Sequence, residues 1–105
     1  MNIDDLIGNT PIVELKSNIF AKLETFNLSG SIKDRIVLYI LDNAERKGLI
    51  NENTILVEAT SGNTGIALAM LGSIKNYKVK IIMPSNMSEE RKQLMRLYGA
   101  EIIEV

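Results

Sequence analysis

Hydrophobic positions in the last half of the chain alternate between strand-like and helix-like runs. Short runs rich in Ile, Val and Leu predict β-strands, and the stretches between them predict helices. The order β-α-β-α-β with short connections predicts parallel strands joined by right-handed crossovers. The fold class is therefore α/β, a parallel sheet with covering helices. In chain order the predicted elements are strand 54–59, a helix containing 66–71, strand 78–83, a helix from Ser88 to Gly99, and strand 101–105.

The first half of the chain has a different pattern. Runs at 12–15 and 19–23 predict two short strands, and the alternation in the second predicts one buried face. Turn-forming residues then lead into a helix predicted over about 32–47. Candidates for the N-cap of that helix are Ser29 and Ser31.

The chain stops inside its last predicted strand. A parallel sheet normally carries helices on both faces, and here no closing helix follows to cover the second one. We therefore expect these 105 residues to be part of a longer polypeptide.

The amino-acid composition excludes several kinds of catalytic and binding site. The sequence has no His and no Cys, which excludes Ser-His-Asp and Cys-His catalysis, the usual zinc ligand sets and disulfides. A net charge of -1 argues against nucleic acid as a partner. The start of the chain is acidic where a secretory leader is basic, and no apolar run reaches the length of a membrane span. We expect a cytoplasmic protein whose chemistry depends on lysine, carboxylates, hydroxyls and backbone groups.

Lys33 is the first candidate for chemistry. It is the one charged residue on the predicted apolar face of helix 32–47. Desolvation and the positive end of the helix dipole favour the neutral amine, which Schiff-base and general-base lysines require. The alternative is a lysine that extends its stem into water from a helix end. The other members of the predicted face are Ile36, Val37, Ile40 and Ala44.

The second candidate is the loop Thr60-Ser61-Gly62-Asn63-Thr64-Gly65, between a predicted strand and a predicted helix. Ligands of α/β sheets usually bind at such loops. Glycines allow close approach of the backbone, and free N–H groups with three hydroxyls suit a phosphate or a carboxylate. The loop matches neither the P-loop nor the dinucleotide fingerprint. The alternative is a tight turn with a capped helix.

Both segments resemble motifs of one enzyme family. Residues 27–35, Asn-Leu-Ser-Gly-Ser-Ile-Lys-Asp-Arg, resemble the pyridoxal-phosphate lysine motif of the cysteine synthase (O-acetylserine sulfhydrylase) and cystathionine β-synthase family. The loop 60–65 is similar to that family's substrate-carboxylate loop. Further similarity at 7–11, 21–24 and 83–100 extends the resemblance over nearly the whole chain.

This resemblance implies a fold type II pyridoxal-phosphate enzyme. Lys33 would carry the cofactor as a Schiff base and move protons at the substrate α-carbon, and Asn63 would hydrogen-bond the cofactor 3'-oxygen. The implied reaction is a β-replacement in which acetate leaves O-acetylserine and sulfide adds to give cysteine. A homodimer is implied for the full-length enzyme. The residues implied to bind the substrate are Thr60, Ser61, Gly62, Asn63 and Thr64.

The family's layout also implies a division of the chain. Residues 1–34 would belong to the large cofactor domain and residues 35–105 to an incomplete small α/β domain. The family's phosphate loop and pyridine-nitrogen partner lie beyond this region, so we expect the chain alone to be inactive. Leu28 departs from the family's usual proline, and the connection from Leu15 to Ile19 is shorter than is common.

Two alternatives remain open. The first is a non-catalytic α/β module that binds an anion or a partner through the loop 60–65. The second is another activity on the same fold, such as that of cystathionine β-synthase, threonine synthase or a dehydratase.

Overall fold

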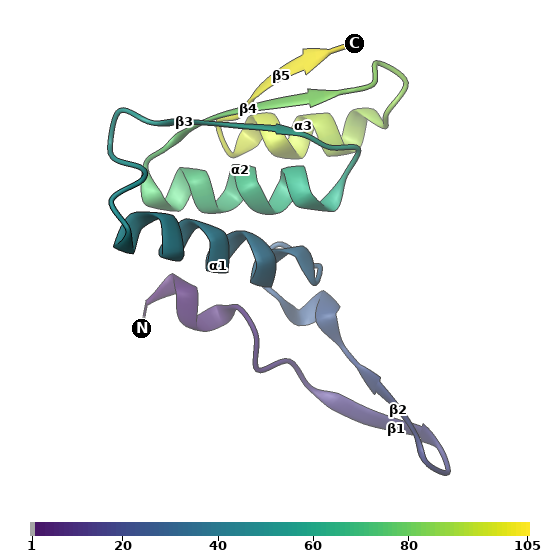
Figure 1. Cartoon of the computed structure of the whole chain (residues 1–105). Coiled ribbons are helices and arrows are strands. Elements are labelled where there is room, and N and C mark those ends of the chain that lie inside the picture. Colours follow the sequence, from purple (N-terminus) through teal and green to yellow (C-terminus); the bar gives the residue numbers. More distant parts are fainter. Residues whose placement is uncertain (1) are drawn as a thin grey trace.

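The computed structural model describes residues 2–105, so Met1 lies outside the described part. A three-stranded parallel sheet in the order β3-β4-β5 lies at one edge of the molecule, with α2 and α3 as the crossovers (Figure 1). The predicted β-α-β-α-β order and the α/β class are confirmed. The elements are β3 (Ile55–Ala59), α2 (Asn63–Lys75), β4 (Lys78–Met83), α3 (Glu89–Leu97) and β5 (Glu101–Glu104).

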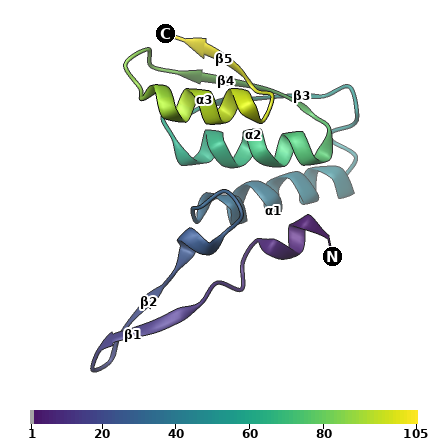
Figure 2. The same ribbon diagram turned by 180° about the vertical axis from the view of Figure 1, so that it is seen from behind.

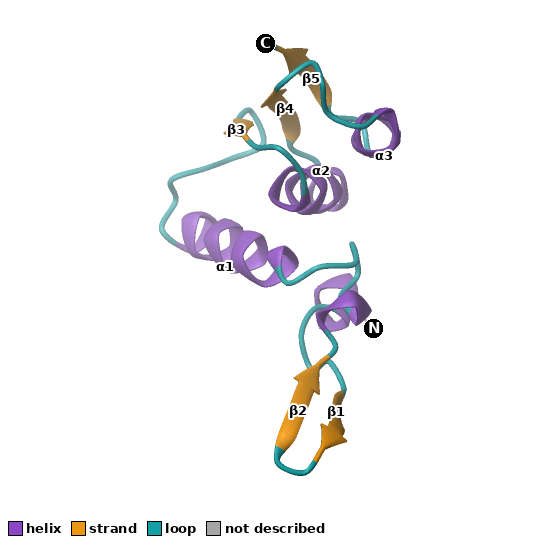
Figure 3. Cartoon of the chain, turned by 90° about the vertical axis from the view of Figure 1, so that its right-hand side faces the viewer, coloured by secondary structure: helices purple, strands orange, loops and turns teal. Residues whose placement is uncertain are grey.

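Both crossover helices pack on the same face of this sheet (Figure 3). Alternate residues of β4 turn toward them, so Val79, Ile81 and Met83 are buried while their neighbours are not. Every residue of α2 from 65 to 72 is buried, as expected for a helix that is apolar nearly all round. The opposite face of the sheet is open and exposes Ile55 and Val57 of β3.

An antiparallel hairpin of β1 (Ile12–Lys16) and β2 (Ile19–Lys22) extends away from this body (Figure 2). Its existence agrees with the prediction, but the predicted buried face is wrong. On the predicted face, Ile19 is exposed and Ala21 and Leu23 are only partly buried. No other described element packs against the hairpin, so alternation in its sequence leads to no fully buried face here.

Helix α1 (Lys33–Arg46) packs against α2, within one residue of its predicted bounds at each end. The predicted apolar face is correct for Val37 and wrong for Ile36 and Ile40. Val37 and Leu41 are buried, whereas Ile36 and Ile40 remain 48% and 57% exposed. The buried face is rotated toward Val37 and Leu41 because α1 packs against α2.

The ends of the helices follow local chemistry. The N-cap of α1 is Ile32, which has no capping side chain, so the prediction of Ser29 or Ser31 is wrong. Ser88 caps α3 as predicted, because its hydroxyl accepts a hydrogen bond from the Arg91 N–H. Gly99 follows α3 with a φ of +94°, a conformation that favours glycine. No helix within residues 2–105 is long and apolar enough to cross a membrane.

Candidate functional site

The turn before α1 is folded back onto the first turn of that helix. Asp34 is fully buried, and its carboxylate accepts hydrogen bonds from the Ser29 N–H at 2.6 Å and from the Ser29 hydroxyl. Ser31 contributes a third bond, because its hydroxyl oxygen accepts from the Lys33 N–H at 3.2 Å. These bonds fix the backbone of Lys33, whose side chain begins at a half-buried position on the helix end. The desolvation expected from a fully apolar face is therefore not present.

Arg35, which follows Asp34, connects α1 to the N-terminal segments. Its Nε donates to Glu24 Oε1 at 2.5 Å, and its Nη2 donates to Glu24 Oε2 and to Thr10 Oγ1, each at 3.2 Å. Hydrogen bonds from Arg35 and, next, from Thr10 lower the pKa of Glu24 from 4.5 to about 2. Glu24 therefore stays ionised over the whole physiological pH range.

Two further polar residues close this network. Asn27 is buried, accepts from the Gly8 N–H at 2.7 Å and donates to the Glu24 backbone oxygen at 3.0 Å. Lys22 donates to Thr10 Oγ1 at 2.7 Å. Sequence reasoning attached no role to Glu24, Asn27 or Thr10, since each side chain meets partners from distant segments.

The loop 60–65 connects β3 to α2 at the carboxyl edge of the parallel sheet. The Thr60 N–H still donates to the Ile82 carbonyl at 3.0 Å, and the Thr60 hydroxyl accepts from the Gly62 N–H at 3.2 Å. Helix α2 then begins at Asn63 behind an N-cap, Gly62, that has no side chain. Of the alternative, a tight turn with a capped helix, the turn is present and the side-chain cap is not, and the first N–H groups of α2 have no intrahelical partner.

Close packing explains one glycine of this loop. A Cβ added at Gly65 would lie 2.6 Å from Thr60 Cγ2 and 3.2 Å from Met95 Sδ. Only glycine allows the loop, α2 and α3 to meet at this distance. A larger residue would push the start of α2 away from the sheet.

A cavity of about 470 Å³ joins the two candidate segments. The turn residues Gly30, Ser31 and Ile32, immediately before Lys33, form one part of its wall, and Asn63 forms another. The structure thus brings Asn63 beside the lysine turn. Thr60 and Ser61 do not line this cavity, and Thr64 lines a separate cavity of about 280 Å³ between α1 and β3.

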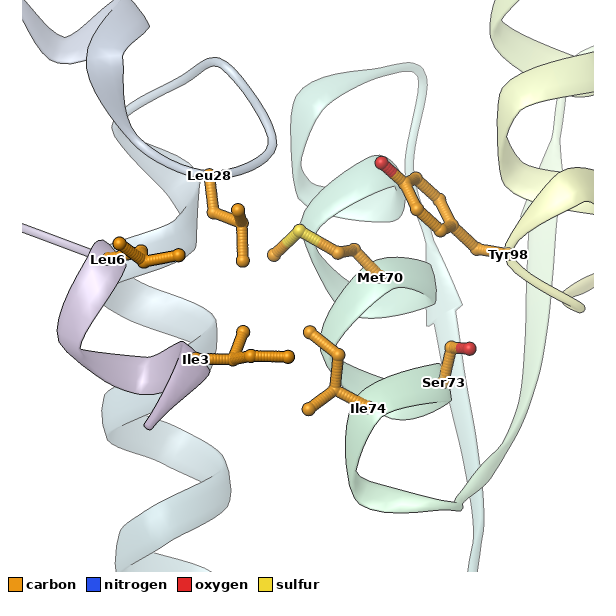
Figure 4. Close-up of a pocket in the computed structure, with 7 residues that line it drawn as sticks. All are labelled: Ile3, Leu6, Leu28, Met70, Ser73, Ile74 and Tyr98. Carbon is orange, nitrogen blue, oxygen red and sulfur yellow. The ribbon is translucent and has the colours of Figure 1, made fainter. Parts of the chain in front are cut away.

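Leu28 lies on the other side of the lysine turn. Its side chain points toward Leu6 and Met70 in an apolar cavity of about 350 Å³ (Figure 4). A leucine at this position therefore contacts α2 through Met70, which a turn residue without a long apolar side chain would not do. The remaining walls are formed by Ile3, Ser73, Ile74 and Tyr98.

Comparison with known proteins identifies the family. The model of the family described as "Pyridoxal-phosphate dependent enzyme" matches residues 3–105. The chain belongs to this family. Pyridoxal phosphate is accordingly the cofactor, and the fold is that of the fold type II enzymes.

Relatives within the family carry consistent names. The chain is 50% identical over 108 residues to cysteine synthase B of Salmonella typhimurium, covering 96% of this chain and 36% of the relative. Cysteine synthase B of Escherichia coli is 49% identical with the same coverage. The chain thus spans about a third of the length of these relatives.

Solved enzyme structures superpose closely on this chain. A hydrogen sulfide-producing enzyme from Fusobacterium nucleatum superposes with a TM-score of 0.91 at 53% identity, covering 97% of this chain and 36% of that one. Cysteine synthase from Entamoeba histolytica gives 0.92 at 42% identity, covering 98% and 34%. The described residues therefore adopt the backbone of the corresponding third of these enzymes.

The residues of the site fit the family's cofactor. The aldehyde of the cofactor forms a Schiff base with a primary amine. Lys33 has such an amine and lies at a helix end whose backbone is fixed. A phenolic oxygen requires a hydrogen-bond donor, and the exposed Asn63 amide offers one at the wall of the cavity that the lysine turn also lines.

Proposed function

We propose that the native protein forms cysteine from O-acetylserine and sulfide by β-replacement. The observation that carries this proposal is the placement of Lys33 directly before two anchored residues, Asp34 and Arg35, with Asn63 at the wall of the cavity that the preceding turn lines. The names of the relatives support the reaction. In this protein the substrates are an amino acid with an acetyl ester and a sulfide nucleophile.

Each residue has a stated task. Lys33 binds the cofactor and then takes the proton from the substrate α-carbon and returns it, and Asn63 orients the ring through its 3'-oxygen. The bound cofactor supplies an electron sink for the negative charge at that carbon. The loop 60–65 orients the substrate, because free N–H groups and hydroxyls suit its carboxylate. The residues assigned to the substrate are Thr60, Ser61, Gly62, Asn63 and Thr64.

The proposal includes a division of labour along the polypeptide. Residues 1–34 belong to the cofactor domain and residues 35–105 to the small domain, and the native enzyme is a cytoplasmic homodimer. Since the relatives are about three times as long, the groups that hold the cofactor phosphate and ring nitrogen are assigned to residues outside these 105. The 105-residue chain by itself is accordingly inactive.

Borohydride reduction tests this proposal. The native protein is incubated with pyridoxal phosphate and reduced, and the labelled peptide is located by mass spectrometry. Label on Lys33, together with cysteine formation from O-acetylserine and sulfide, supports the proposal. A non-catalytic module would show neither. Label on Lys33 without cysteine formation would support the cofactor site and contradict the proposed substrates.

A further inference from the structure

Helix α3 makes a side-chain hydrogen bond to the loop 60–65 through Arg91. Its Nη1 donates to the Ser61 carbonyl oxygen at 3.2 Å, across 30 positions of sequence. A Cβ added at Gly62 would lie 2.1 Å from this Nη1 and 3.1 Å from Cζ. A side chain at position 62 would therefore displace the guanidinium, which is the far end of a flexible side chain.

The turn that carries Arg91 is itself anchored. Lys92 is 1% exposed and donates to the Ser85 carbonyl at 2.8 Å. Its ammonium also pairs with Glu104 at 2.7 Å and with Glu89 at 3.2 Å. The contacts of Lys92 therefore fix the turn of α3 from which Arg91 extends to the loop.

The hydrogen bond sets the orientation of one peptide plane. The Ser61 carbonyl and the Gly62 N–H belong to the same planar, trans peptide and point in opposite directions. Arg91 holds the carbonyl, and the Thr60 hydroxyl accepts from the N–H at 3.2 Å. Both ends of the plane are fixed immediately before α2 begins at Asn63.

We propose that Arg91 is a positioning residue for carboxylate binding by the loop 60–65. By hydrogen-bonding the Ser61 oxygen it reduces the partial negative charge that this oxygen would present to a bound anion. It also fixes the peptide that precedes the free N–H groups of α2. Arg91 joins none of the ion pairs among residues 2–105, so no carboxylate cancels its charge. This inference rests on the proposed role of the loop in binding the substrate.

The first test compares two ligands that differ by a carboxylate. L-serine and ethanolamine are titrated into the cofactor-loaded native protein, and binding is followed by cofactor absorbance. Arg91→Met should weaken L-serine binding about tenfold, the lower end of what a charged hydrogen bond contributes, and leave ethanolamine binding unchanged. Arg96→Met, the same substitution on the exposed last turn of α3, is the matched control and should change neither.

The second test uses Gly62. Gly62→Ala forces the guanidinium away while keeping its charge, so it should reproduce most of the loss in L-serine affinity. The double variant should then bind no more weakly than Gly62→Ala alone, because both changes remove the same interaction. In cofactor-free protein, amide hydrogen exchange at 61–65 should accelerate in both single variants and not in Arg96→Met.

The outcomes separate two failures. Wild-type protein that binds L-serine no better than ethanolamine would overturn the carboxylate role of the loop, and the role of Arg91 with it. A wild-type preference that survives in Arg91→Met would overturn only the role of Arg91. Additive losses in the double variant would do the same.

Discussion

Replacing Asp34 by Asn should loosen the turn that carries Lys33. The buried carboxylate accepts two hydrogen bonds from Ser29, one from the backbone N–H at 2.6 Å and one from the hydroxyl. A hydrogen bond to a charged group contributes about 1.5 to 3 kcal/mol. Asn keeps one oxygen that accepts from the Ser29 N–H but loses the charge that strengthens this bond, so hydrogen exchange of the Ser29 amide should accelerate by about tenfold, since about 1.4 kcal/mol corresponds to a factor of ten.

The assay is residue-resolved hydrogen exchange on cofactor-free native protein, compared with borohydride labelling of Lys33 in the same variant. Ser29→Ala removes only the hydroxyl, so Lys33 labelling should fall less than in Asp34→Asn. Asp42→Asn is the matched control on α1, because Asp42 is half exposed and pairs with Lys75 away from the turn. Protection of the Ser29 amide within twofold of wild type in Asp34→Asn would refute the reasoning.

Three further predictions concern neighbouring residues. Lys33→Ala and Lys33→Arg should both abolish borohydride labelling and lower turnover by several orders of magnitude, because neither side chain forms an imine; normal turnover in either would place the catalytic amine elsewhere. The pKa of Glu24 is lowered from 4.5 to about 2, so its contribution to stability is complete above pH 4.5 and is lost as the pH falls toward 2. Urea unfolding should then show a cost of Glu24→Gln that shrinks over this interval, and a constant cost would contradict it. Thr64→Ala should weaken L-serine binding by about one to two powers of ten while the cofactor spectrum persists, whereas Asn63→Ala should change that spectrum; unchanged affinity with a lower melting temperature would instead make the loop a structural turn.

The periodicity of hydrophobic residues was sufficient to predict the strands of the parallel sheet. It failed to predict which face of α1 is buried. In strand 78–83 alternation decides which residues are buried, because a strand has only two faces. Helix α1 carries apolar residues on two neighbouring faces, with Ile36 and Ile40 on one and Val37 and Leu41 on the other. The choice between them depends on where α2 lies, and no local pattern contains that information.

The site depends on contacts that the local sequence does not contain. Arg91 and Ser61 are 30 positions apart, and neither has an unusual neighbourhood in the sequence. One signal could have been used. Gly62 has no side chain, and the Arg91 guanidinium lies where a Cβ would be. Without coordinates the occupant could not be identified.

The position of Lys33 was predicted for a reason that the structure does not support. Its apolar neighbours at 36 and 40 are half exposed and provide little desolvation. What distinguishes the position is the chemistry of the adjacent residues: Asp34 binds the preceding turn, and Arg35 binds Glu24 and Thr10. A flexible lysine can meet a cofactor productively only if its backbone is held, because entropy opposes each bond that the side chain must order for itself. The position is therefore defined by two anchored residues that directly follow the lysine, Asp34 and Arg35, which hold the start of α1 to the preceding turn and to the N-terminal segments.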